Sequence, residues 1–150
     1  MELCRADDAV VGPADGRMGA YFEGRHHPQQ ALAARVGYVA VANEAVVGYI
    51  AGHETQRLNC RGEVQYLYVT AEYRRQGVGT KLLKQLARWF QVHGAAIVCV
   101  NVNTESPAAA PFYLACGARP VNEYWYVWPD ISAVFDSENR PNRPSQPDTR

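Results

Sequence analysis

The clearest pattern of apolar and polar positions in the chain predicts a long amphipathic helix after Gly77. Apolar residues recur there at spacings of three and four, which places them on one face of a helix. These residues are Val78, Leu82, Leu83, Leu86, Trp89 and Phe90. Basic and amide side chains fill the opposite face, and His93 with Gly94 ends the helix. We therefore expect the apolar face to pack on a sheet.

Apolar runs on both sides of this helix predict two buried strands. Residues 64–69 precede the helix and residues 96–100 follow it. A strand, a helix and a strand within about 40 residues predict a right-handed parallel crossover. In open α/β sheets a ligand lies beyond the carboxyl ends of parallel strands. Such a ligand would lie here near Val69 and near residues 101–104.

Weaker patterns predict the remaining strands. Residues 36–42 and 45–52 are rich in β-formers, and the two residues between them suit a hairpin turn. Gly48 and Gly52 indicate a bulge or a close backbone approach in the second of these strands. Alternate residues of a strand face opposite sides, so the aromatic residues near the end of the chain should divide between the core and a cleft. The other expected strands are 2–6, 118–122 and 123–128.

Two shorter helices are predicted beside the main one. A helix is expected at 28–35, because residues 29–34 are good helix formers and Pro28 suits the first turn. Residues 107–116 follow Ser106, which is a suitable N-cap, and Gly117 ends this second helix. Pro111 inside it either kinks the helix or marks the start of its regular part.

Length and composition indicate one globular domain without a net charge. A chain of 150 residues is the size of a single domain, expected at 1–135, with a disordered polar tail at 136–150. The formal net charge is zero, which argues against a nucleic-acid binder. The first residues carry charges and no apolar run, so we expect no signal peptide, no membrane span and a cytoplasmic protein.

Cysteine and histidine positions indicate no metal site. The cysteines form no Cys-x-x-Cys pair and have no histidine at ligand spacing, so we expect buried, reduced thiols. His26 and His27 follow a loop predicted at 12–19 and are interpreted as a solvated turn, with lining of a substrate cleft as the alternative. The cysteines are Cys4, Cys60, Cys99 and Cys116.

The loop that opens the central helix has the features of a phosphate site. Backbone N–H groups in the first turn of a helix lack intrahelical partners and favour an anion. Gly77 and Gly79 let a phosphate approach the backbone, and Arg74 and Arg75 add two cations beside it. A dinucleotide-binding fingerprint would require a glycine in place of Leu82, so NAD binding is disfavoured. The loop therefore favours a diphosphate of another carrier.

Two segments together resemble one enzyme superfamily. Residues 64–83 look like the acyl-CoA-binding core of the GCN5-related N-acetyltransferase (GNAT) superfamily, with its Arg/Gln-x-x-Gly-x-Gly/Ala loop. Residues 111–118 resemble the Phe-Tyr-x-x-x-Gly-Phe signature that lies downstream in that superfamily. With the preceding hairpin the resemblance covers residues 36–128. It implies an α/β (α+β) fold whose mixed, mostly antiparallel central sheet has a parallel strand pair at the CoA cleft and helices on its flanks.

The resemblance also implies a function. It predicts an acetyl-CoA-dependent N-acetyltransferase that moves an acetyl group to a primary amine of a small molecule or peptide, by direct attack in a ternary complex. The partners would be acetyl-CoA as co-substrate and an amine acceptor, and a homodimer is compatible with this function. The alternative is a non-catalytic acyl-CoA sensor or regulatory module on the same fold.

The residues implied to bind acetyl-CoA lie in three segments. Ser106 stands where the family commonly has an asparagine that bonds the pantetheine arm. The implied set is Leu67, Tyr68, Val69, Arg74, Arg75, Gln76, Gly77, Val78, Gly79, Thr80, Asn101, Ser106 and Tyr113.

Three residues are candidates for the proton transfers. The resemblance implies that the phenol of Tyr113 donates a proton to the CoA sulfur, and a phenol and a thiol are close enough in pKa for that exchange; the alternative is a core tyrosine. Glu63 matches the catalytic glutamate of histone-type members, counted back from Gly77. Glu54 and water are the other candidates for general base. Gln65 stands where other members carry an acid, and an amide cannot accept the proton.

Overall fold

The computed structural model describes residues 1–5 and 31–136 of the 150-residue chain. Its strands are β1 (Glu2–Arg5), β2 (Ala31–Ala42), β3 (Ala45–Thr55), β4 (Gly62–Val69), β5 (Val98–Asn101), β6 (Arg119–Pro120) and β7 (Trp125–Trp128). Its α-helices are α2 (Val78–Val92), α3 (Ala109–Ala115) and α4 (Ala133–Asp136). Short 3₁₀ helices lie at η2 (Arg57–Asn59) and η3 (Ala71–Tyr73).

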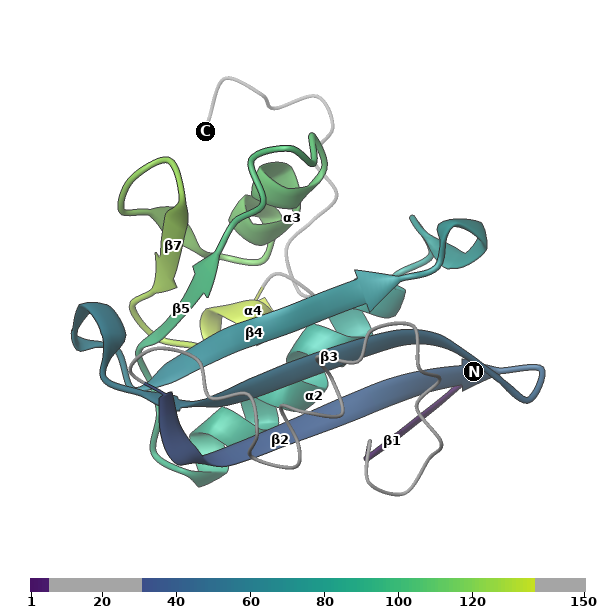
Figure 1. The fold of residues 1–150 in the computed structure, drawn as a ribbon, viewed down its shortest axis with the longest axis horizontal. Helices are drawn as coiled ribbons and strands as arrows, with labels where there is room; N and C mark the ends of the chain where they lie inside the picture. Colours follow the sequence, from purple (N-terminus) through teal and green to yellow (C-terminus); the bar gives the residue numbers. More distant parts are fainter. Residues whose placement is uncertain (6–30, 137–150) are drawn as a thin grey trace.

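The strands form one mixed sheet. Within the described residues it has seven strands in the order β1-β2-β3-β4-β5-β7-β6 (Figure 1). Of the strand pairs in these ranges, only β4 and β5 run parallel, and α2 connects them. The predicted fold class, mostly antiparallel with one parallel pair and flanking helices, is therefore confirmed.

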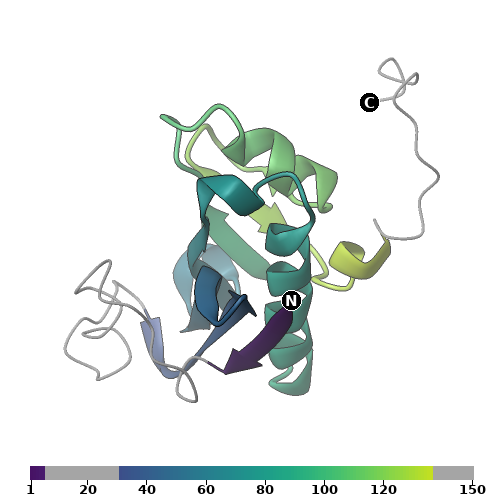
Figure 2. The ribbon, with the colours of Figure 1, turned by 90° about the vertical axis from the view of Figure 1, so that its right-hand side faces the viewer.

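The helix α2 packs its apolar face on β2, β3 and β4 (Figures 1 and 2). Trp89 lies at the edge of this face, where it is half-buried and stacks on His93 with ring centroids 4.0 Å apart. Burial of this face is what holds the helix on the sheet, because isolated helices of this length are marginal in water. The fully buried residues of the face are Leu82, Leu83, Leu86, Ala87 and Phe90.

The hairpin between β2 and β3 has the expected two-residue turn. Asn43 and Glu44 have φ values of 51° and 66°. Positive φ at both central residues is the mark of a type I′ turn, whose twist matches that of the flanking strands. Ala42 pairs directly with Ala45 across this turn.

Both glycines of β3 lie where the sheet is irregular, as predicted. The register of β2 with β3 shifts beside Gly48, and the register of β3 with β4 shifts beside Gly52. A Cβ atom on Gly52 would lie 2.8 Å from the carbonyl oxygen of Glu63. The backbones of β3 and β4 therefore approach each other too closely there for any side chain.

The predicted helix at 28–35 is wrong for the part that the structure describes. Residues 31–35 begin β2 and pair with the end of β3, Ala31 with Thr55 and Arg35 with His53. Helix propensity differs by about 0.7 kcal/mol or less between ordinary residues, so pairing with a neighbouring strand outweighs it.

The helix α3 begins two residues later than expected. Its N-cap residue is Ala108, and no side chain caps it, so the N-cap role predicted for Ser106 is wrong. Pro111 is the third residue of the helix, where a backbone N–H has no intrahelical partner to lose. The regular part therefore begins close to Pro111, and Gly117, with a φ of 99°, ends the helix as predicted.

Some predictions lie outside the described residues: the loop at 12–19, the turn at His26 and His27, and the tail after residue 136. The short helix α4, which the sequence pattern did not indicate, buries Val134. None of the helices in the described ranges is long and apolar enough to span a membrane.

Candidate functional site

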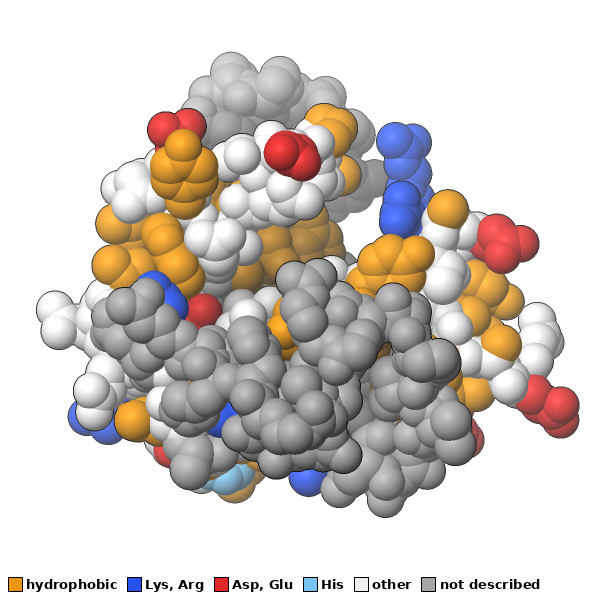
Figure 3. Space-filling view, viewed as in Figure 1, with side chains coloured by type: hydrophobic (Ala, Val, Ile, Leu, Met, Phe, Trp, Pro, Cys, Tyr) orange, Lys and Arg blue, Asp and Glu red, His pale blue; other side chains and the backbone are white. Residues whose placement is uncertain are grey.

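A cleft opens where β4 and β5 separate. The two strands pair only from Gly62–Val98 to Val64–Val100, and β4 then continues to Val69 paired with β3 but not with β5. The cleft has a volume of about 1170 Å³ and is lined by β4, the loop and first turn of α2, the end of β5, and α3. Figure 3 shows the surface hollowed beside a column of Lys or Arg side chains (blue). The predicted position, at the carboxyl ends of the two parallel strands, agrees with this cleft.

The edge of β4 that faces the cleft carries unpaired backbone groups. The N–H of Thr70 donates to the carbonyl of Val47 at 2.9 Å, one residue beyond the Val69–Gly48 pair. In antiparallel pairing this makes Val69 and Gly48 a non-hydrogen-bonded pair, so the N–H and C=O of Val69 point away from β3. The same alternation turns the N–H and C=O of Leu67 toward the cleft. An extended ligand could bond to this edge as an added strand.

The loop before α2 is shaped to receive an anion. Arg75 and Gly77 have φ values of 64° and 84°, both in the left-handed region. Turns of this kind gather successive N–H groups into a concave anion site, and Gly77 is also the N-cap of α2. Positive φ is uncommon on a non-glycine residue such as Arg75, and residues with it lie in turns or at functional sites. The helix terminus adds partial positive charge to these N–H groups.

The long side chains of the loop have different partners. Arg74 donates from Nε to the carbonyl of Val69 at 2.8 Å, and its guanidinium carbon lies 5.7 Å from the ring centre of Tyr68. Gln76 donates from Nε2 to the carbonyl of Glu72 at 2.9 Å, which closes the turn before α2. Arg74 therefore contacts the open edge of the cleft, whereas the side chain of Gln76 supports the loop from outside it.

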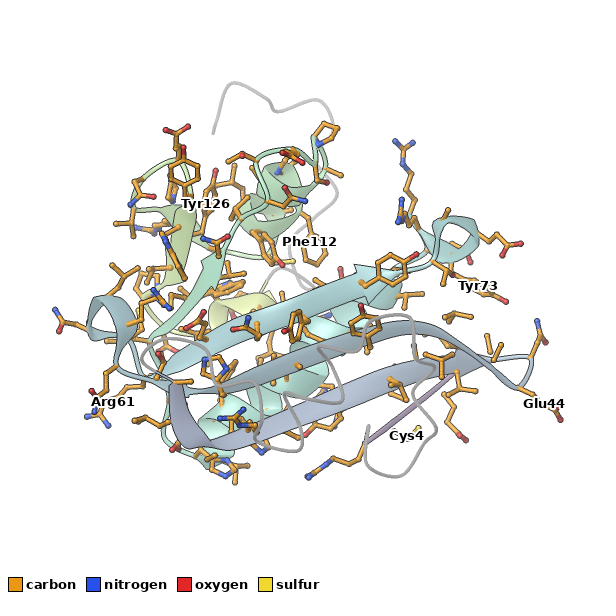
Figure 4. All side chains as sticks on the ribbon, viewed as in Figure 1. Cys4, Glu44, Arg61, Tyr73, Phe112 and Tyr126 are labelled. Carbon is orange, nitrogen blue, oxygen red and sulfur yellow. The ribbon has the colours of Figure 1, made fainter. Side chains whose placement is uncertain are left out.

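The structure brings together nearly all residues that the resemblance implied for binding acetyl-CoA. Every residue of that set except Gln76 lines the cleft. Figure 4 shows Phe112 on the side of α3 toward β4, and Tyr73 beyond the end of β4. The lining residues that the sequence analysis did not single out include Tyr49, Tyr73 and Phe112. Only the strand pairing and the packing of α3 bring these three to one place.

Tyr113 points its buried ring into the cleft from α3. It is 8% exposed, and its ring packs edge-on against Trp128 and Phe112, with centroids 5.9 and 5.1 Å apart. The indole N–H of Trp128 donates to the carbonyl of Cys116 at 3.0 Å, which fixes this packing. Burial raises the pKa of the Tyr113 phenol above its usual range. The hydroxyl therefore remains protonated at neutral pH and acts as a donor.

Glu63 lies in a buried polar cluster beside the cleft. Its side chain is 4% exposed. Its Oε1 lies 3.3 Å from Nε of Arg57, 3.4 Å from Nε2 of His53 and 3.5 Å from the hydroxyl of Thr55. Arg57 in turn lies 4.6 Å from the ring centre of Trp125. Glu63 is not among the residues that line the cleft.

The two candidate carboxylates lie on opposite faces of the sheet. Glu63 pairs with His53, and Glu54 pairs with Gly62, so their side chains alternate in direction. A Cβ on Gly62 would meet the ring of Phe90, which places Glu54 on the face covered by α2. Glu63 shares the other face with Tyr66, which does line the cleft. Glu63 is therefore the better placed of the two.

The aromatic residues of β7 alternate between core and surface, but none of them is among the residues that line this cleft, in contrast to the expectation. Tyr126 and Trp128 are buried, whereas Trp125 is half-buried against Arg57. Tyr124, before the strand, is exposed. The strand therefore contributes one ring to the Glu63 cluster and two to the core.

The described cysteines are thiols, three of them buried. Burial raises the pKa of Cys60 and Cys99, and it raises the pKa of Cys116 to about 11. Such thiols stay protonated at neutral pH and are poor nucleophiles. In the described part of the chain no three His, Cys, Asp or Glu side chains gather as a metal site would require.

Comparison with solved structures finds this fold in acetyltransferases. The PaiA N-acetyltransferase of Thermoplasma acidophilum, in complex with coenzyme A, is 18% identical, with a TM-score of 0.54 over 63% of this chain and 58% of that chain. A proposed streptothricin acetyltransferase of Bacillus anthracis, in complex with acetyl coenzyme A, is 19% identical, with a TM-score of 0.54 over 64% and 62%. The IAA acetyltransferase of Bacillus cereus is 19% identical, with a TM-score of 0.61 over 81% and 78%. The matches therefore span less than two thirds of the first two proteins, and at these identities they show the fold alone.

The family comparison covers most of the chain. No curated protein matches it. The model of the acetyltransferase (GNAT) family matches residues 11–118, a range that includes β4, the loop before α2, and α3. The chain therefore belongs to the GNAT family of acetyltransferases.

Proposed function

We propose that the protein is an acetyl-CoA-dependent N-acetyltransferase that moves an acetyl group to a primary amine of a small molecule or peptide. One observation carries this proposal: an anion-binding loop, an open strand edge and a buried phenol line one cleft. The coenzyme A and acetyl coenzyme A bound to two structural relatives support the same ligand.

Acetyl-CoA would lie along β4 from the loop toward the end of the strand pairing with β5. The N–H groups around Gly77 would bind its diphosphate, and the exposed side chain of Arg75 would add a positive charge. The pantetheine arm would then bond to the edge groups of Leu67 and Val69. Since Arg74 already donates to the carbonyl of Val69, the arm would bond mainly to the N–H of Val69 and to both groups of Leu67.

The chemistry needs few protein groups. A neutral amine attacks the thioester carbon, the C–S bond breaks, and the acetyl group passes directly to nitrogen. Burial raises the pKa of Tyr113 further above that of a thiol, which disfavours the proton donation expected from the resemblance. Tyr113 instead donates a hydrogen bond to the departing sulfur and keeps its proton. Glu63 takes the amine proton through a water, since its carboxylate lies behind the cleft wall. Holding thioester and amine together is the largest contribution, roughly 7–11 kcal/mol.

A thermal shift assay with acetyl-CoA, NAD and ATP in parallel tests the ligand. At about 100 times its Kd, acetyl-CoA should stabilise the fold by roughly 2.7 kcal/mol, whereas NAD should not. No shift with acetyl-CoA would refute both the enzyme and the acyl-CoA sensor. Thiol release over a panel of primary amines then separates these two, because a sensor would bind acetyl-CoA without releasing CoA.

Gly77→Ala should weaken acetyl-CoA binding at least tenfold. The φ of 84° is strained for alanine, by roughly 1 kcal/mol, and a methyl group there would displace the N–H groups from the diphosphate. Gly94→Ala is the matched control, because Gly94 also has a positive φ, of 72°, and no atom within 4 Å of an added Cβ, but it does not line the cleft. Calorimetric titration compares the two variants with wild type, and an unchanged affinity in Gly77→Ala would exclude the loop as the diphosphate site.

Glu63→Gln should lower kcat by about 100-fold at neutral pH if Glu63 receives the amine proton. Glu54→Gln is the control, since Glu54 lies on the other face of the sheet. A wild-type kcat in Glu63→Gln, measured by thiol release, would leave water as the base and Glu63 as an anchor for Arg57.

A further inference from the structure

One buried polar atom in the cleft lacks a partner. The side-chain oxygen Oε1 of Gln65 is shielded from solvent and accepts no hydrogen bond from the described residues, although the side chain lines the cleft. Buried polar atoms are nearly always hydrogen-bonded, and an unpaired one lowers the stability of the fold. Because the side chain lines the cleft, a rotation about its last bond would turn this unpaired acceptor toward a donor on a ligand there.

Gln65 lies at a bulge in β4, just beyond the end of the pairing with β5. It follows Val64, the last residue of β4 that pairs with β5. On the other side, Tyr66 pairs with Ala51 and Val64 pairs with Gly52, so Gln65 is the extra residue of a bulge. It thus lacks a strand partner on both sides and lies at the inner end of the cleft.

The spacing along β4 relates this position to the arm of acetyl-CoA. Groups that face one edge of a strand repeat every two residues, or about 6.8 Å. The edge groups of Val69 and Leu67 lie nearest the diphosphate loop, and one further repeat reaches Gln65, where the bulge interrupts the backbone edge. The arm contains two amides separated by two carbon atoms. If the outer amide bonds at Leu67, the inner amide, next to the sulfur, reaches Gln65.

We propose that Oε1 of Gln65 accepts a hydrogen bond from the pantetheine amide N–H nearest the sulfur. This proposal rests on the proposed function, because it assumes that acetyl-CoA binds along β4. Gln65 is then a positioning residue: it fixes the end of the arm, and with it the thioester, at the depth of the Tyr113 hydroxyl. A neutral amide oxygen suits this purpose because it accepts an N–H without competing for the proton of the attacking amine.

The experiment compares two ligands in wild type and in two variants by calorimetric titration. One ligand is acetyl-CoA, and the other is an analogue in which an ester oxygen replaces that single N–H. Wild type should bind acetyl-CoA about tenfold more tightly than the analogue, the usual effect of one hydrogen bond. Gln65→Met, similar in length but without an acceptor, should bind both ligands equally. Gln65→Glu keeps a carbonyl oxygen and should restore the preference for acetyl-CoA.

Two results would overturn the proposal. Equal affinity of wild type for the two ligands would do so without any variant, so the test does not depend on the folding of Gln65→Met. A tenfold preference that persists in Gln65→Met would assign the N–H to another acceptor, such as the backbone of β4. Failure of wild type to bind acetyl-CoA at all would instead refute the proposed function, and this outcome is distinguishable from the other two.

Discussion

Tyr113→Phe should lower kcat by about 100-fold and leave acetyl-CoA binding unchanged. Phenylalanine keeps the edge-on ring contacts with Trp128 and Phe112, so only the hydroxyl is lost. Without that donor the departing sulfur develops its negative charge in a buried site with no hydrogen bond from α3, and loss of such a donor typically costs two to three orders of magnitude in rate. Stopped-flow or colorimetric detection of free CoA measures kcat, and calorimetry measures the affinity.

The raised pKa of Tyr113 also predicts how the effect of this substitution varies with pH. Burial raises the pKa of Tyr113, so the hydroxyl stays protonated up to and beyond the usual value near 10. The ratio of wild-type to variant rates should therefore be constant from pH 7 to pH 10. Tyr126→Phe is the control, because Tyr126 is also buried but does not line the cleft. A ratio that declines near pH 8, or an equal loss in both variants, would contradict the donor role.

Gly52→Ala should lower the free energy of unfolding by about 1–3 kcal/mol. Its new Cβ would lie 2.8 Å from the carbonyl oxygen of Glu63 and 3.0 Å from the side chains of Leu86 and Phe90. A backbone oxygen cannot rotate away, so β3 and β4 must separate where the bulge begins. Urea denaturation followed by circular dichroism measures the change.

Gly94→Ala serves as the comparison for this effect. Gly94 has a φ of 72°, but no atom lies within 4 Å of its added Cβ, so the cost should be backbone strain alone, about 1 kcal/mol. Only Gly52→Ala should also reduce affinity for acetyl-CoA, because it displaces the strand that forms the cleft wall. Equal losses of stability in the two variants, with unchanged affinity for acetyl-CoA in both, would contradict the prediction. The close approach of β3 and β4 would then not be what makes alanine unfavourable at position 52.

Much of the fold and cleft follows from local rules that the sequence displays. The apolar spacing after Gly77 defines α2, because a helix buries every third or fourth residue whatever its partner. The turn at Asn43 and Glu44 follows from strand patterns on both sides of two polar residues, of which asparagine adopts positive φ readily. The anion loop likewise depends only on neighbouring residues, Arg74 to Gly79.

The rest depends on residues that are distant in the sequence. Residues 31–35 have helix propensity and become a strand because β3 is long enough to pair with them. The resemblance implied that Glu63 is a base, but its contacts with His53 and Arg57 arise only when β3, β4 and η2 meet. The polar sequence His53–Glu54–Thr55 at the end of an apolar strand was the one local sign of a buried polar cluster. The unpaired Oε1 of Gln65 likewise depends on a bulge that the sequence located only approximately, through Gly52.

The edge of β4 that β5 leaves uncovered beyond Val64 also affects the protein without a ligand. Exposed strand edges recruit strands from other molecules and start cross-β aggregation. Here the guanidinium of Arg74 holds the carbonyl of Val69, and α3 stands across from the strand with Phe112 facing it. Arg74 thus occupies one acceptor of this edge, which opposes strand addition from another molecule but leaves the N–H of Val69 and both groups of Leu67 for a small extended ligand.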